Sequence, residues 1–282
     1  MESSAFMQTT PANTHHTDRD RTGYGMGVRL AGVWSAVAFF FFWLVGFAFL
    51  AQWIPPLAPS DNAEQIANLF RTRTYPIMAG MVLMVIGSAL YLPWTALLSD
   101  FIREVEGPSR FLSGTQLAAG VMSASTFFLP ALIWAAAAFR PARNPEITQA
   151  LVDLGWLLFI TPIVPFIVQY LTLAAAIFTD RRSEPTFPRW VGYLQVWISI
   201  TFLPAFAAYF MKTGPLAWNG ILVWWIPFAA FTTWFAIMIT LARRAVLQGA
   251  RRQADTAALT PDLHRPERHP SVSVTSDTSA IP

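Results

Sequence analysis

The side chains that most often do chemistry lie far from the apolar parts of this sequence. Its four histidines are His15, His16, His264 and His269, all near the chain ends, and it contains no cysteine. Haem ligation, zinc sites and histidine-assisted nucleophilic catalysis need such residues inside a folded domain. We therefore predict no metal site, no cofactor and no catalytic residue of these kinds.

Two carboxylates remain as candidates for acid–base chemistry. Asp153 and Glu106 lie at the ends of apolar segments, not within them. An acid in the middle of a membrane marks a functional site by default, but an acid at its edge can be hydrated. Asp153 and Glu106 are therefore candidate interfacial acids, and an enzyme that uses them is the least favoured of the hypotheses below.

The elements that must position any site follow from the distribution of charge. Only 12% of the 282 residues are charged, about half the share of a soluble domain. Six runs of 22 to 31 residues hold no charged side chain at all. About 20 apolar residues suffice for one helical membrane span. The sequence therefore predicts an all-α, polytopic integral membrane protein with six transmembrane helices.

The predicted boundaries follow from these runs and from local helix signals. We expect a transmembrane domain over 28–245, between disordered cytoplasmic tails at 1–27 and 246–282, because the tails are rich in Ser, Thr and Pro. The six spans are expected at about 30–53, 75–99, 113–139, 150–178, 190–211 and 217–241.

Three helix ends carry specific signals. The second span should continue through the charged segment 100–106 and stop at Gly107. The fourth should begin outside the bilayer, at Asn144 followed by Pro145. Asp61 and Glu64 have the spacing of a capping box, which predicts a short amphipathic helix in the loop after the first span.

The basic residues predict the orientation. With the N-terminus inside, 14 of the 19 Lys and Arg residues lie on the inner side. The positive-inside rule then places both termini in the cytoplasm, and we expect the plasma (inner) membrane. The net charge of +3 does not indicate nucleic-acid binding, because the arginines lie beside the spans, where they contact anionic lipid headgroups.

Prolines inside the predicted spans point to a candidate site. Each removes one backbone hydrogen bond and frees the carbonyl four residues earlier, so we expect several kinked helices. Helices three to six would then spread around a pocket suited to an apolar ligand. Structural kinks without a pocket are the competing interpretation. The interior prolines are Pro93, Pro130, Pro162, Pro165, Pro204 and Pro227.

The candidate ligand-binding residues are hydroxyl, amide and indole side chains at the depth of these prolines. Gln169 is the leading polar candidate, although a hydrogen bond between helices would explain it equally well. The full set is Gln169, Tyr170, Thr161, Thr126, Trp134, Trp156 and Trp224.

Two non-catalytic hypotheses rank above the enzyme. The first is a multi-pass membrane protein that binds or translocates a small apolar or weakly polar molecule through helices three to six. The second is a membrane subunit or scaffold that binds a protein partner through its cytoplasmic loops or tail. An internal cavity distinguishes the two, because a scaffold has no need of one.

Overall fold

Six helices of the chain are long and apolar enough to cross a membrane. The structure is a computed structural model and describes residues 25–259, which are all-helical apart from connecting loops. The predicted tails lie largely outside the described residues, as do all four histidines. The six spans are Met26–Leu50, Thr74–Glu106, Phe111–Phe139, Pro145–Thr179, Arg189–Tyr209 and Ile221–Arg252.

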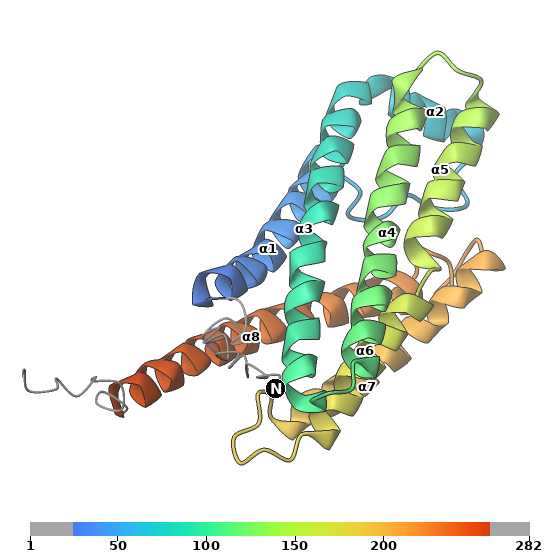
Figure 1. Cartoon of the computed structure of the whole chain (residues 1–282). Coiled ribbons are helices and arrows are strands. Elements are labelled where there is room, and N and C mark those ends of the chain that lie inside the picture. Colours follow the sequence, from blue (N-terminus) through green and yellow to red (C-terminus); the bar gives the residue numbers. More distant parts are fainter. Residues whose placement is uncertain (1–24, 260–282) are drawn as a thin grey trace, which may run out of the picture.

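The described part of the chain forms a bundle of long helices (Figure 1). Several spans combine an α-helix with a tighter or wider helical segment. A π-helical turn, η2, continues α1, and another, η4, precedes α8, while the 3₁₀ segment η3 follows α7. In chain order the elements are α1 (Met26–Leu44), η2 (Val45–Leu50), α2 (Ala63–Thr72), α3 (Thr74–Glu106), α4 (Phe111–Phe139), α5 (Pro145–Ile160), α6 (Val164–Thr179), α7 (Arg189–Phe202), η3 (Leu203–Tyr209), η4 (Ile221–Trp225) and α8 (Ile226–Leu259).

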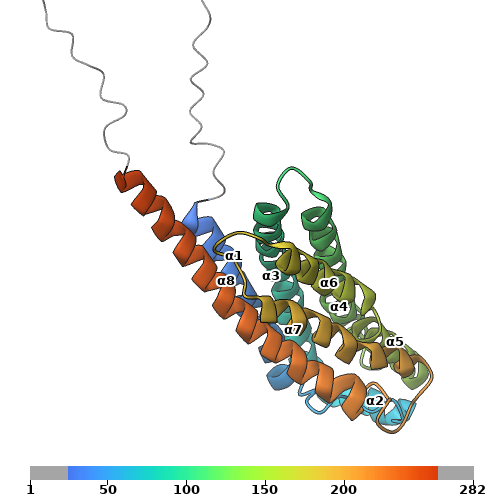
Figure 2. The ribbon, with the colours of Figure 1, turned by 90° about the horizontal axis from the view of Figure 1, so that it is seen from below.

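Helix α3 is the centre of the bundle. It packs against α1, α4 and α6, whereas α8 packs against α1 and α7. The start of α1 and the end of α8 lie at the same end of the bundle, and α2 lies at the opposite end (Figure 2). We call these the Arg29 end and the α2 end.

The local helix signals are confirmed at two sites and shifted at a third. Helix α3 runs to Glu106 and ends at Gly107, whose φ of 66° favours glycine. Asn144 caps α5, with Pro145 in the first turn. The capping box of α2 is formed by Asn62 and Gln65 and not by Asp61 and Glu64, because Asn62 supplies the side-chain oxygen that accepts from the N3 amide.

Helix α8 continues past the predicted end of the transmembrane domain. We expected a disordered tail from residue 246, but the helix extends to Leu259. Residues 241–259 are rich in Ala, Leu, Gln and Arg, all strong helix formers. The charged residues among them therefore do not end the helix.

The interior prolines have different local effects. Helices α3 and α4 are continuous through Pro93 and Pro130. At Pro162 the chain leaves the helix for the short break between α5 and α6. Pro204 lies in the first turn of η3, and Pro227 follows the π-helical turn η4.

Small residues let the helices approach closely. A Cβ atom added at Gly46 would lie 2.5 Å from the carbonyl oxygen of Gly80, and one added at Gly80 would lie 2.6 Å from that of Gly46. These two glycines therefore allow backbone contact between η2 and α3. Close approach through small residues is the usual way that membrane helices pack.

Candidate functional site

A cavity of about 100 Å³, partly open to its surroundings, lies between the helices of the bundle. Residues of α1, α4, α5, α6, α7, η3, η4 and α8 line it, together with the break between α5 and α6. Pro162 and Pro227 are part of the lining, so two of the proline interruptions meet there. The lining is formed by Phe39, Phe40, Trp43, Thr126, Phe127, Phe159, Ile160, Pro162, Ile163, Phe166, Phe202, Ala205, Val223, Trp224, Pro227, Phe228 and Phe231.

Stacked aromatic rings form one wall of the cavity. Trp43 and Phe159 stack with their centroids 5.4 Å apart, and Trp224 and Phe228 stack at 5.6 Å. Behind them Phe47 stacks against Trp43 at 4.6 Å and against Trp224 at 5.4 Å. The stack connects α1 and η2 to α5, η4 and α8, so packing of rings from five segments fixes the shape of the wall.

Three lining residues carry a buried polar atom without a hydrogen-bond partner. These atoms are Trp43 Nε1, Trp224 Nε1 and Thr126 Oγ1, none of which bonds to any other described residue. All three residues are at most 5% exposed. Pro130 has no backbone N–H, so the Thr126 carbonyl lacks the hydrogen bond that it would accept from residue 130 in a regular helix. These three atoms are enclosed by protein, and the surface of the cavity itself is almost entirely apolar.

Two of the seven candidate ligand-binding residues, Thr126 and Trp224, line the cavity. Gln169 lies outside the lining, in a buried network between helices. Its side chain accepts a hydrogen bond from the Tyr91 hydroxyl at 2.9 Å and donates one to Thr95 Oγ1 at 3.1 Å. The structure thus gives Gln169 the hydrogen bonds between helices that we considered as its alternative role.

The other four candidates also lie outside the lining. The Thr161 hydroxyl bonds to that of Tyr209 at 2.6 Å, and Trp134 donates to the Val152 carbonyl at 3.3 Å. Tyr170 and Trp156 are both 0% exposed. Their rings pack within the aromatic core, where Tyr170 contacts Trp234, and Trp156 contacts Trp134 and Trp218.

Sequence reasoning missed the contribution of the first span. We assigned the pocket to helices three to six, but Phe39, Phe40 and Trp43 of α1 also line the cavity. The available signal was the run of four phenylalanines, 39–42, followed by Trp43. Such a run is ambiguous, because in a membrane both lipid-facing and buried positions are apolar.

The two candidate interfacial acids lie at opposite ends of the bundle. Glu106 ends α3 at the Arg29 end, where its carboxylate accepts hydrogen bonds from the backbone amides of Leu112 and Ser113 at 2.8 and 3.2 Å. Asp153 lies near the middle of α5, in the part of the Pro145–Thr179 span toward the α2 end. The two carboxylates cannot act on one substrate, and Glu106 instead caps the start of α4.

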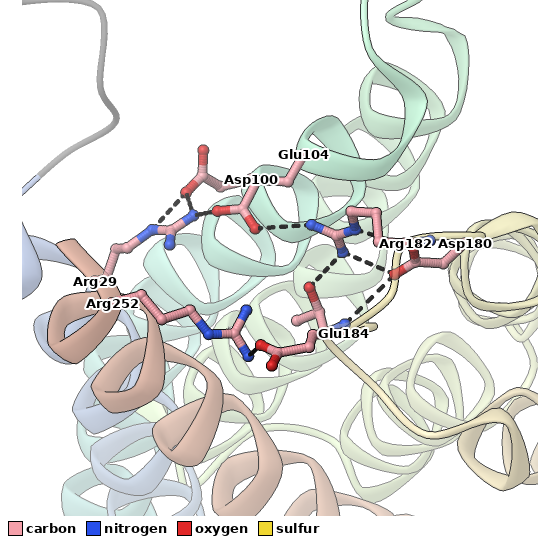
Figure 3. Close-up of polar contacts among 8 residues, drawn as sticks. Arg29, Asp100, Glu104, Asp180, Arg182, Glu184 and Arg252 are labelled. Carbon is pink, nitrogen blue, oxygen red and sulfur yellow. Dashed lines mark hydrogen bonds and ion pairs between the residues drawn. The ribbon is translucent and has the colours of Figure 1, made fainter. Parts of the chain in front are cut away.

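The charged side chains of the Arg29 end form an ion-pair cluster that links four segments (Figure 3). Arg29 of α1 pairs with Asp100 of α3 at 2.5 Å and also with Glu104. Arg182, in the loop after α6, pairs with Glu104 at 3.8 Å and with Asp180 at 2.7 Å. The remaining pairs are Arg103 with Asp100 and Arg252 with Glu184.

Asp180 is the most enclosed acid of the ion-pair cluster, with a side chain only 3% exposed. Hydrogen bonds from the Arg182 guanidinium lower the pKa of Asp180, and the same contact raises the pKa of Arg182. Both groups are therefore charged at neutral pH. Asp180 also accepts a bond from the Arg182 backbone amide, so it fixes the loop between α6 and α7.

Comparison with known proteins gives no match to a family model, a curated protein or a solved structure. The chain itself has two features with the chemistry and geometry of a functional region, the aromatic cavity and the ion-pair cluster at the Arg29 end.

Proposed function

We propose that this multi-pass membrane protein binds a small apolar or weakly polar molecule in the aromatic cavity. The observation that carries the proposal is that proline interruptions and stacked rings meet around a cavity between the helices. Ligand sites are typically concave and lined mostly by hydrophobic and aromatic side chains. This cavity has such a lining, and its almost entirely apolar surface suits an apolar or weakly polar molecule.

The size of the cavity indicates the size of the ligand. An engineered apolar cavity of about 150 Å³ binds benzene. The space here, about 100 Å³, is somewhat smaller, so a single planar ring would fit after small movements of the surrounding side chains.

A role in translocation is the second part of the proposal. The cavity is lined from the middle of α1 and α4, and the ion-pair cluster lies at the Arg29 end of the same helices. We propose that a ligand leaving toward that end passes between the helices that these ion pairs connect. The distribution of basic residues supports a cytoplasmic location for this end, and we propose the plasma membrane as its site.

A cavity-filling variant tests the proposal. Ala205 lines the cavity and is 3% exposed, so a phenylalanine at this position would occupy the space. Wild type and Ala205→Phe would be purified from their native membrane in nanodiscs, and bound lipid-soluble molecules identified by mass spectrometry after extraction. We expect a small aromatic or alicyclic compound in stoichiometric amount with the wild type and its loss from Ala205→Phe.

The control is Ala118→Phe, the same change at an exposed position of α4. It should retain the compound, because its added ring faces lipid. Equal recovery of the same compounds from wild type and Ala205→Phe would show that they come from the surrounding lipid and would refute the proposal.

A further inference from the structure

The arginines of the Arg29 end fall into two groups. Four of the ten described arginines at this end belong to the ion-pair cluster, where each pairs with an acid. Only six acids lie among the described residues of the same end, which therefore keeps an excess of four positive charges. The other six arginines are exposed and form no ion pair with any described residue: Arg110, Arg181, Arg189, Arg243, Arg244 and Arg251.

Arg181 and Arg189 lie on either side of the loop between α6 and α7. Arg181 is the second residue after the end of α6, and Arg189 is the first residue of α7. The two helices pack side by side (Figure 2), so both arginines lie at the same end of this helix pair. The ion pair of Arg182 with Asp180 holds the loop between them in place.

Exposed aromatic side chains continue from these arginines along α7. Trp190, Tyr193 and Trp197 recur at intervals of three and four residues, so they share one face of the helix. They are 50%, 68% and 53% exposed, whereas Gln195 on the opposite face is fully buried. The Tyr193 ring contacts that of Phe178 in α6, with the centroids 5.0 Å apart. We call these four rings, together with the two arginines, the outer α6–α7 face.

We infer that the outer α6–α7 face selectively binds an anionic phospholipid. The lipid phosphate would accept hydrogen bonds from Arg181 and Arg189, because a guanidinium presents paired donors that match phosphate oxygens. One acyl chain would lie along the exposed rings of α7, which lead from the arginines toward the middle of the span. Tryptophan and tyrosine favour this boundary between headgroups and hydrocarbon. The inference concerns the outer surface of the bundle and does not depend on the cavity.

Charge complementarity favours a lipid over a second copy of the chain. In a symmetric dimer the same surface meets itself. A dimer through this face would therefore bring the unpaired Arg181 and Arg189 of both copies together, whereas a phosphate neutralises them. A zwitterionic lipid also has a phosphate, but its ammonium group adds a positive charge beside the arginines. The face therefore favours a headgroup with a net negative charge.

Two lipids with the same acyl chains test the inference. Dioleoyl phosphatidylglycerol has a net negative headgroup, and dioleoyl phosphatidylcholine has a zwitterionic one. Each would be titrated onto the delipidated full chain in a neutral detergent, and native mass spectrometry would give the Kd of the first bound lipid. One arginine near an anionic headgroup contributes about a fivefold gain in affinity. We therefore expect phosphatidylglycerol to bind wild type about 5- to 25-fold more tightly than phosphatidylcholine.

A pair of double variants locates the binding site. Arg181→Gln with Arg189→Gln removes both guanidinium groups, and we expect the preference to fall below about twofold. Arg140→Gln with Arg143→Gln is the matched control, because it removes the same charge at the α2 end, where neither arginine pairs with a described acid. The control should keep the preference of wild type.

A measurement on wild type alone provides a second test. Amide hydrogen exchange would be compared between nanodiscs of phosphatidylglycerol and of phosphatidylcholine. We expect slower exchange over residues 180–193 in phosphatidylglycerol, because the bound headgroup orders the loop and the start of α7. Exchange in the loop between α4 and α5, at the α2 end, should be the same in both lipids.

Four results would overturn the inference. The first is equal binding of the two lipids to wild type. The second is an equal loss of preference in both double variants, which would show that total charge and not this face attracts the lipid. The third is displacement of phosphatidylglycerol by inorganic phosphate, which would show that the headgroup binds without the acyl chain. The fourth is a lipid-free dimer that protects residues 180–193 from exchange, which would show that a second copy occupies the face.

Discussion

Replacement of Gly120 by alanine should disrupt the junction between α3, α4 and α6. A Cβ atom at position 120 would lie 2.7 Å from the Cβ of Thr95, closer than real side chains approach. The Thr95 hydroxyl would have to move, although it accepts hydrogen bonds from Gln116 at 3.2 Å and from Gln169 at 3.1 Å. The substitution therefore affects steric fit and hydrogen bonding together.

The expected magnitude follows from three contributions. Overpacking of a well-packed site costs about 1–3 kcal/mol. Loss of the two hydrogen bonds to Thr95 adds about 0.6 kcal/mol each, the average for polar contacts between membrane helices. The helix propensity of alanine offsets up to about 1 kcal/mol. We therefore expect Gly120→Ala to lower the free energy of unfolding by about 1–3 kcal/mol.

The assay is unfolding in mixed micelles with increasing SDS, followed by far-UV circular dichroism. Gly114→Ala is the matched control in the same helix, because no atom lies within 4 Å of a Cβ built there. Gly114→Ala should be neutral or slightly stabilising. If the two variants differ by less than about 0.5 kcal/mol, the close contact between Gly120 and Thr95 does not exist as described.

Three further predictions concern other contacts. Arg182 lowers the pKa of Asp180, so this pair should stabilise the fold above the unfolded pKa of about 4. The stabilisation should be lost as the pH falls through the pKa of Asp180 in the folded protein. The melting temperature should therefore fall less between pH 7 and pH 3 in Asp180→Asn than in wild type. Gly80→Ala should lower stability by about 1–3 kcal/mol, because its Cβ would meet the Gly46 carbonyl, and SDS unfolding would measure the loss. Asp100→Asn removes the carboxylate that pairs with both Arg29 and Arg103. We expect faster amide hydrogen exchange at the start of α1 in this variant. An unchanged exchange rate there would show that Asp100 does not anchor α1.

The sequence was sufficient to predict the elements because charge is confined to the ends of the spans. The six charge-free runs correspond to the six long helices, and the signals at Asn144 and Gly107 identify the ends of two helices. These features depend on solvation of charge and on backbone geometry within a few residues. Such local physics can be read without knowing which helices are neighbours.

The lining of the cavity could not be predicted in the same way. Phe39 and Phe41 are identical residues two positions apart, yet Phe39 is 1% exposed and lines the cavity, whereas Phe41 is 60% exposed. In water, a polar residue would mark the outer face of the helix, but in lipid both faces are apolar. Which face of α1 meets α4 and α8 depends on tertiary contacts, and these are not encoded in local composition.

The uncharged lining of the cavity also determines how a bound molecule responds to voltage. A membrane potential of 100 mV does about 2.3 kcal/mol of work on each elementary charge that crosses it. A neutral molecule in this cavity carries no such charge, and neither do the residues that line it. The membrane potential would therefore do no work on such a molecule itself, and depolarisation would not change its affinity for the cavity.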